Sequence, residues 1–146
     1  MSAFLELPAA TPLIVFSVLL VLKMGAVGFA TALTRSRAKV VINPEDTVVT
    51  PGARTAAEEV ASVLRAKRVH QNDLENIPGF LVLALLFTLA GFSAASGWVY
   101  FGTFFAARVL HSVFYLNGVQ PWRTVAFAIG LLTQLGIMVR LLMAVF

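Results

Sequence analysis

The sequence contains no cysteine among its 146 residues. This absence excludes disulfide bonds, thiolate metal sites and a cysteine nucleophile supplied by the protein. The His, Asp and Glu residues show no spacing that is typical of a metal site, so no bound metal is expected. Candidate functional groups are therefore sought among the arginine, histidine, tyrosine and carboxylate side chains.

Charged residues are also scarce. They make up 12% of the chain, against 59% hydrophobic residues, and the mean hydropathy is +0.87. This composition is typical of a membrane protein rather than of a soluble domain. The net charge of +4 is not carried by a soluble basic module, so nucleic acid is not an expected partner.

Carboxylates are missing from the middle of the apolar segments. All 7 acidic residues lie near the N-terminus, in the long connection around residues 35–55, or at the entry to the second apolar segment. Proton-coupled transporters usually carry a carboxylate deep in a membrane helix, so this distribution argues against one. The two halves of the chain also show no internal repeat, which weakens an inverted-repeat transporter.

Long apolar segments dominate what is present. Each comes close to the ~20 residues that span ~30 Å of hydrocarbon as an α-helix. No alternation of barrel type is seen, and open sheets are not stable in lipid. We therefore predict an all-α integral membrane protein, a four-transmembrane-helix bundle that forms a single domain over residues 1–146. The predicted helices span about 11–34, 56–94, 97–116 and 121–145.

Local signals refine these helices. Thr55 followed by Glu58 resembles a capping box and predicts that the second helix starts near Ala56. Pro78 removes a backbone donor inside that helix and predicts a kink. Lys23 lies in the middle of the first apolar segment, so we expect it to face the bundle interior and to have a polar partner.

The basic residues predict the orientation in the membrane. The third connection, between the predicted third and fourth helices, has Arg123 at its end. The second connection, between the predicted second and third helices, carries no basic residue. By the positive-inside rule, the first and third connections lie in the cytoplasm and both termini lie outside. Arg140 opposes this weakly, as a single cation near a helix end that can snorkel. The compact chain suggests a bacterial inner membrane. The basic residues of the first connection and its flank are Arg35, Arg37, Lys39, Arg54, Arg65, Lys67 and Arg68.

Two polar stripes enter the membrane segments on the predicted cytoplasmic side. Arg68, Asn72 and Glu75 fall at i, i+4 and i+7, which places them on one face of a helix. A second set has the spacing i, i+3 and i+7 in the third segment. This second set is Arg108, His111 and Tyr115. Ionisable groups are costly in hydrocarbon and usually have a function there, so the stripes predict a binding site.

Arginines dominate this predicted site, because Arg35 and Arg123 fall on the same side of the membrane. A guanidinium group pairs with carboxylates bidentately and keeps its charge when desolvated, which suits a small, multiply charged anionic ligand. Glu75 can accept a ligand ammonium or hold a neighbouring arginine. Arg108 has two alternative roles. It can form an ion pair with Glu75 or Asp73, or it can contact the ligand directly.

Two segments closely resemble the family of membrane-associated proteins in eicosanoid and glutathione metabolism. They are RAKRVHQNDLENIPGFLVL at 65–83 and ARVLHSVFYLNGVQPWR at 107–123. The resemblance extends to Leu22-Lys23-Met24 and Asn43-Pro44-Glu45-Asp46, so it reaches all four predicted helices. It implies a homotrimer of four-helix subunits, with glutathione bound between neighbouring subunits near the cytoplasmic side.

The resemblance also implies roles for single residues. Arg123 matches the residue that stabilises the thiolate. Thr124 takes the place of a serine that is proposed to assist the thiol in the prostaglandin synthases. Asp46 matches an aspartate that is also implicated in assisting the thiol in those enzymes. Gln71 departs from the family, since the prostaglandin synthases have an arginine there. The turn before Arg123 is more similar to that of the transferases. The predicted glutathione contacts are Arg35, Arg68, Asn72, Glu75, Arg108, His111, Tyr115 and Arg123.

These observations predict a glutathione-dependent membrane transferase. It would activate the glutathione thiolate for attack on lipophilic electrophiles and reduce lipid hydroperoxides as a further activity. The expected partners are glutathione as cofactor, a lipophilic electrophile and membrane lipid, with the site facing the cytoplasm. The alternatives are a prostaglandin-synthase-like isomerase that also uses glutathione, a small four-helix transporter without glutathione chemistry, and a non-catalytic binding protein.

Overall fold

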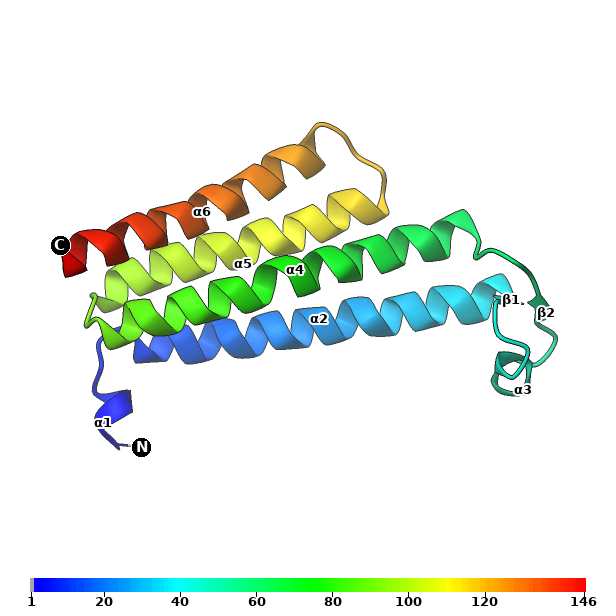
Figure 1. Cartoon of the computed structure of the whole chain (residues 1–146), viewed down its shortest axis with the longest axis horizontal. Coiled ribbons are helices and arrows are strands. Elements are labelled where there is room, and N and C mark those ends of the chain that lie inside the picture. Colours follow the sequence, from blue (N-terminus) through cyan, green and yellow to red (C-terminus); the bar gives the residue numbers. More distant parts are fainter. Residues whose placement is uncertain (1) are drawn as a thin grey trace.

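The computed structural model describes residues 2–146, and its architecture is a bundle of long helices (Figure 1). The long helices are α2 (Ala10–Ala38), α4 (Ala61–Leu89), α5 (Ala94–Leu116) and α6 (Trp122–Val145). Short elements complete the described chain, namely α1 (Ser2–Leu5), β1 (Val40–Val41), α3 (Asp46–Val49) and β2 (Arg54–Thr55). The predicted all-α, four-helix architecture is confirmed, because each of the 4 long helices is long and apolar enough to cross a membrane.

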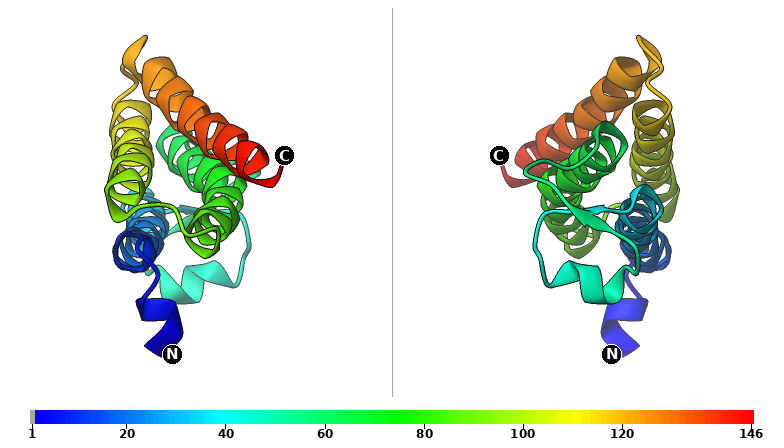
Figure 2. Two further views of the ribbon diagram at one scale, coloured as in Figure 1. Left: turned by 90° about the vertical axis from the view of Figure 1, so that its left-hand side faces the viewer. Right: turned by 90° about the vertical axis from the view of Figure 1, so that its right-hand side faces the viewer.

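Helices α4 and α5 contact each other across the bundle, which Figure 2 shows end-on. Helix α2 packs against both of them on one side, and α6 packs against both on the other. The α4–α5 connection and the end of α6 lie at one end of the bundle, whereas β1, β2 and α3 lie at the opposite end (Figure 1). The polar loop and the C-terminus are therefore separated by the length of the helices.

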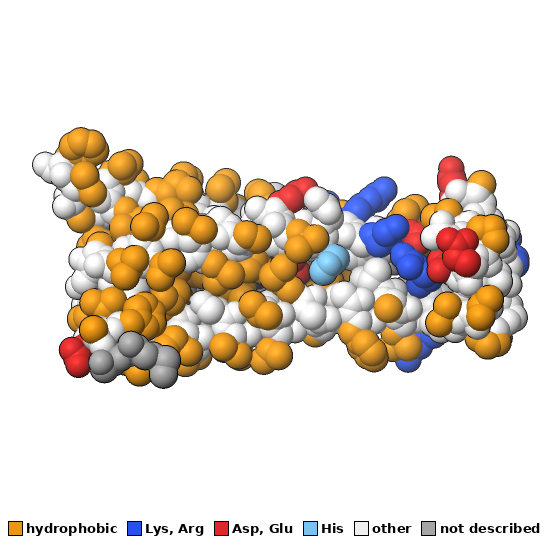
Figure 3. All heavy atoms as spheres, turned by 60° about the horizontal axis from the view of Figure 1, so that its bottom comes forward, with side chains coloured by type: hydrophobic (Ala, Val, Ile, Leu, Met, Phe, Trp, Pro, Cys, Tyr) orange, Lys and Arg blue, Asp and Glu red, His pale blue; other side chains and the backbone are white. Residues whose placement is uncertain are grey.

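Aromatic side chains fill the core between α4 and α5. The ring of Phe80 stacks on that of Phe104 at 3.8 Å between centroids and meets Phe101 edge-on at 5.8 Å. All three side chains are buried. The outer faces of the helices also carry many apolar side chains. The charged side chains gather towards the end of the bundle that carries the long connection (Figure 3). This distribution is the one expected for helices whose outer faces contact lipid.

The predicted start of the second membrane helix is wrong. Helix α4 begins at Ala61 and not near 56, and no side chain caps its N-terminus. Thr55 cannot cap the helix because it belongs to β2, where it pairs in parallel with Val41. The strand is held by backbone bonds from Arg54 N to Lys39 O at 3.0 Å and from Ala56 N to Val41 O at 2.9 Å. Backbone pairing with the end of α2 therefore keeps residues 54–56 extended.

The other helix ends also differ from the predicted ranges. Helix α4 ends at Leu89 rather than at 94, since Gly91 has a positive φ of 76° that stops the helix. Ser93 then caps α5, accepting a bond from the backbone N–H of Ser96 at 3.3 Å, so this helix begins at Ala94 rather than at 97. Helix α2 continues to Ala38, beyond the predicted 34. Pro78 lies inside α4, which continues through it.

Helices α2 and α5 approach each other closely near their N-terminal ends. A Cβ atom added to Gly97 would lie 2.8 Å from Cγ of Pro12 and 3.2 Å from Cβ of Ala9. Gly97 is buried, and both facing residues are buried as well. The absence of a side chain at this position therefore sets the distance between the two helices.

We expect Gly97→Val to lower the free energy of unfolding by about 1–3 kcal/mol, because overpacking forces helices apart. Thermal unfolding of the detergent-solubilised protein would measure this. The control is Gly25→Ala in α2, where an added Cβ meets no atom within 4 Å. An equal loss of stability in both variants would contradict the close approach at Gly97.

Candidate functional site

A network of polar side chains is buried in the middle of the bundle. Lys23 of α2 donates to both carboxylate oxygens of Asp73 at 2.5 Å and to Oγ of Ser112 at 2.6 Å. The Asp73 side chain is 0% exposed and that of Lys23 is 10% exposed. The predicted interior position and polar partner of Lys23 are therefore confirmed, and the network joins α2, α4 and α5.

Arg108 extends this network towards the predicted site. Its Nη2 lies 3.2 Å from Oδ1 of Asp73, donates to Oδ1 of Asn72 and lies 3.5 Å from Nδ1 of His111. The Arg108 side chain is 1% exposed, so its charge is enclosed and paired. Of its two predicted roles, the structure shows the ion pair with Asp73. Through that pair, Arg108 orients Asn72 and His111, one residue from each predicted stripe.

A second group of predicted residues lies at the adjoining ends of α5 and α6. The ring of His111 meets that of Tyr115 edge-on at 5.6 Å, and the guanidinium carbon of Arg123 lies 4.5 Å from the centroid of the Tyr115 ring. The Gln120 amide fits both of its neighbours in one orientation. In that orientation its oxygen accepts from Nε of Arg123 at 3.0 Å, and its nitrogen donates to Oγ1 of Thr124 at 3.1 Å. The two predicted catalytic residues of α6 thus share one amide.

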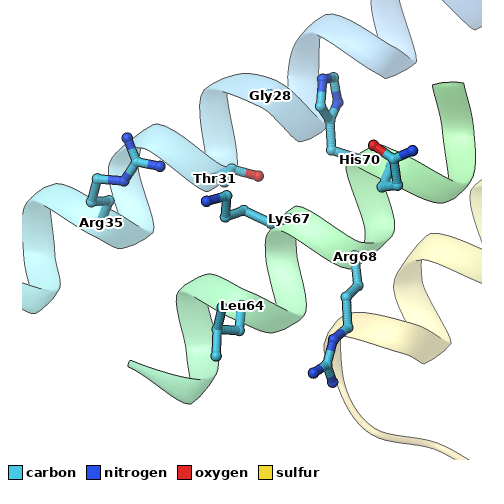
Figure 4. A pocket seen from close by; sticks show the side chains of 8 residues that line it. Gly28, Thr31, Arg35, Leu64, Lys67, Arg68 and His70 are labelled. Atoms are coloured by element: carbon cyan, nitrogen blue, oxygen red, sulfur yellow. The ribbon is translucent and has the colours of Figure 1, made fainter. Parts of the chain in front are cut away.

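A groove of about 480 Å³ runs between α2 and α4 at the charged end of the bundle (Figure 4). Arg35 lines it from α2, while Lys67 and Arg68 come from α4, and Arg68 points away from the other two. Nε of Arg35 and Nδ1 of His70 are buried there without a hydrogen-bond partner among residues 2–146. The groove is therefore lined by cationic side chains, with two polar nitrogen atoms buried in its wall.

Glu59 pairs with two of the cations that line this groove. Its carboxylate lies 2.9 Å from Nη2 of Arg35 and 2.8 Å from Nζ of Lys67, and the Glu59 side chain is 4% exposed. Burial by itself raises the pKa of Glu59, but the hydrogen bond from Lys67 and the charges of Lys67 and Arg35 outweigh it and lower the pKa. Glu59 is therefore held as a carboxylate.

Two predicted residues lie apart from these groups. Glu75 is exposed, and its Oε1 accepts a bond from Nε2 of Gln71 at 3.1 Å. Asp46 opens α3 and lines a small cavity of about 190 Å³ together with Arg35. Among residues 2–146, no hydrogen bond or ion pair joins Asp46 or Arg35 to Arg123. One chain therefore does not gather the predicted catalytic residues in one place.

Comparison with known proteins identifies the chain. The model of the MAPEG family matches residues 13–143. The chain belongs to the MAPEG family. It is 35% identical to microsomal glutathione S-transferase 1 of Homo sapiens over 131 residues, which cover 87% of this chain and 84% of the human protein. It is 33% identical to prostaglandin E synthase of Homo sapiens over 130 residues, or 88% of this chain and 85% of that protein.

Membership in the MAPEG family confirms the resemblance that the sequence showed. Together with the 4 apolar helices, it makes the chain an integral membrane protein. The region matched by the family model runs from the first turn of α2 to the last turn of α6. The buried network and the α5–α6 group therefore both lie within the matched region.

Two side chains at these sites, Gln120 and Glu59, were not predicted from the sequence. Gln120 stands three residues before Arg123 and four before Thr124, a spacing that brings side chains together at a helix start. Glu59 lies outside the helix and is brought to Arg35 by the strand pairing, for which the sequence has no local signal. The first was detectable from spacing, and the second depends on tertiary structure.

We expect Asp73→Asn to cost about 3–5 kcal/mol of stability, because Lys23 and Arg108 would then carry uncompensated buried charges. Adding Lys23→Met should restore part of that loss, since it removes one of the two cations. Thermal unfolding of both single variants and the double variant gives the coupling between the sites. Strictly additive losses would show that Lys23 and Asp73 do not interact.

A pH series tests the ion pairs of Glu59. Because its pKa is lowered from 4.5, the pairs stabilise the folded protein fully above pH 4.5 and are lost as the pH falls further. We therefore expect the thermal midpoint to fall less steeply for Glu59→Gln than for wild type below pH 4.5. Glu58→Gln is the control, since Glu58 is exposed and should leave the profile unchanged. Parallel profiles for wild type and Glu59→Gln would exclude the stabilising pairs.

Proposed function

We propose that this MAPEG chain is a glutathione-dependent membrane transferase that activates a thiolate for attack on lipophilic electrophiles. The observation that carries the proposal is the placement of Arg123, whose guanidinium lies 4.5 Å over the Tyr115 ring and is anchored through Nε to Gln120. This cation stands at the start of α6, in a chain 35% identical to a microsomal glutathione transferase.

The residues present fit glutathione, a ligand with two carboxylates, an ammonium group and a thiol. Arg68 is exposed beside the groove and suits a carboxylate, and Arg35 lines the same groove from α2. Exposed Glu75 suits the ammonium group, and Asn72 and His111 are oriented by Arg108 to offer hydrogen bonds. The kinds of charged and hydrogen-bonding groups that glutathione needs are therefore present, which supports the proposal.

When bound, glutathione supplies the sulfur nucleophile. Arg123 favours the charged form of that sulfur by opposite-charge attraction and hydrogen bonding. A free thiol has a pKa of about 8.5, so most of it is protonated at neutral pH. Lowering that value by ~2 units requires roughly 2.7 kcal/mol of preferential stabilisation of the thiolate. Thr124, whose hydroxyl lies beside the Gln120 amide, would donate a second hydrogen bond to the sulfur, and Tyr115 supports the guanidinium through its ring.

We also propose that the site is completed by a second copy of the chain in a homotrimer. Support comes from the separation of the predicted residues, since Arg35 and Asp46 lie on the α2 side and Arg123 lies at the α5–α6 end. Arg35 and Asp46 of one subunit facing Arg123 of the next would reunite them. The site would then face the cytoplasm of a bacterial inner membrane, since the positive-inside rule assigns that side to the long connection.

The lipid-facing position of the site suits its second substrate. Lipophilic electrophiles concentrate in the bilayer, and a site at the membrane edge joins them to a water-soluble nucleophile by proximity. Lipid hydroperoxides reach the same position, so peroxidase activity belongs to the proposal. Product analysis with glutathione and a chlorinated nitrobenzene, a lipid hydroperoxide or an endoperoxide distinguishes transferase, peroxidase and isomerase. Turnover of none of them, with no thermal stabilisation by glutathione, would exclude the enzyme.

We expect Arg123→Ala to raise the pKa of bound thiol and to lower kcat/KM by about 100-fold, which corresponds to the ~2.7 kcal/mol above. Thiolate absorbance on mixing with glutathione and steady-state kinetics measure the two effects. Arg37→Gln is the matched control, because Arg37 is exposed in the last turn of α2 and has no predicted role in the site. Unchanged turnover of Arg123→Ala would remove Arg123 from the catalytic role.

A further inference from the structure

A second cationic position lies at the opposite end of the bundle, near the end of α6. Arg140 is exposed, and its guanidinium carbon lies 5.1 Å from the centroid of the Phe92 ring. Among residues 2–146 it forms no ion pair and no side-chain hydrogen bond. Positive charge at this end also runs against the positive-inside distribution of the other basic residues. Arg140 therefore carries an unbalanced charge at a membrane boundary.

The position of Arg140 is fixed by a series of aromatic contacts. Phe92 stacks on Phe87 at 4.3 Å, and Phe87 meets Tyr100 edge-on at 5.7 Å. Tyr100 in turn lies against α6 where Gly136 leaves room, since an added Cβ there would lie 3.1 Å from the ring. Arg140 thus rests on a packed platform rather than on a free loop.

Two adjoining cavities surround this platform. One, of about 450 Å³, is lined by Arg140, Phe92 and Tyr100. The other, of about 630 Å³, is an apolar groove between α4 and α6, and both cavities share Ala144. Each volume falls in the range of roughly 300–1,000 Å³ that is typical of ligand sites. The residues of the apolar groove are Leu83, Leu86, Ala90, Met138, Leu141, Leu142, Ala144 and Val145.

We propose that these cavities bind one anionic phospholipid. Arg140 and the Tyr100 hydroxyl hold the headgroup phosphate, and an acyl chain lies in the apolar groove. Arg140 has no ion-pair partner among residues 2–146, so its charge is complementary to that of a lipid anion, and the adjoining groove offers only apolar side chains. A tyrosine at the level of the headgroups agrees with the usual position of aromatic residues at the membrane interface. The site lies at the far end of the bundle from Arg123 and does not depend on glutathione.

Lipid retention tests the proposal. The protein is reconstituted in vesicles of phosphatidylcholine and phosphatidylglycerol and extracted in mild detergent, and the lipids retained per chain are measured by mass spectrometry. We expect wild type to enrich phosphatidylglycerol, and Arg140→Gln to lose this enrichment by about fivefold, as expected for one cation near an anionic surface. Arg140→Lys and Arg37→Gln should retain it.

A second variant tests the apolar half of the site without changing charge. Leu86→Trp fills the groove and should also reduce the retained phosphatidylglycerol, which keeps the test valid if Arg140→Gln does not fold. Wild-type retention in either folded variant would overturn the proposal. Thermal stabilisation by inorganic phosphate equal to that by phosphatidylglycerol would overturn it as well, since the acyl chain would then contribute nothing.

The remaining occupant to exclude is a second copy of the chain. Because the sequence has no cysteine, Leu142→Cys places a single thiol in the groove. In a lipid-filled groove, the thiol should react with a membrane-soluble maleimide and should form no disulfide between copies. Protection from the maleimide in the intact oligomer, or a disulfide-linked dimer formed in high yield, would show that a neighbouring subunit covers the groove, and the lipid proposal would be wrong.

Discussion

The ion network around Asp73 is the interaction on which the rest of this structure depends. A carboxylate in a membrane bundle is costly unless charges and hydrogen bonds surround it, and Asp73 has two cations as partners. Its partners come from α2 and α5, so the network fixes the rotation of three helices about their axes. Apolar packing alone specifies such rotations weakly, because the outer faces of the same helices are apolar too.

The Asp73 network is connected to the candidate site through a few contacting side chains. Asp73 holds Arg108, and Arg108 contacts Asn72 and His111, which adjoins Tyr115. The side chains that would touch a ligand are therefore oriented by residues that would not. Such an arrangement positions the site by an ion network inside the protein, so the side chains that would bind ligand are held in place before it arrives.

The sequence was sufficient for the membrane helices because their signal is local. Length, hydropathy and the isolated charge of Lys23 are properties of single segments, and the interior position of Lys23 followed from them. The start of α4 was not predictable, because Thr55 is held by pairing with Val41, a contact between distant parts of the chain. The stripe spacing correctly grouped Arg108 with His111, but it could not show that Asp73 takes the charge of Arg108.

Gln120 gives the α6 end a property that a free arginine would lack. Its amide oxygen accepts from Nε of Arg123 while the Tyr115 ring supports the guanidinium face, so both the plane and the position of the cation are set. The conformational entropy of a long side chain is then lost when the protein folds rather than when a reaction occurs. In its proposed role, Arg123 is consequently a preorganised cation, which would stabilise developing negative charge without rearranging.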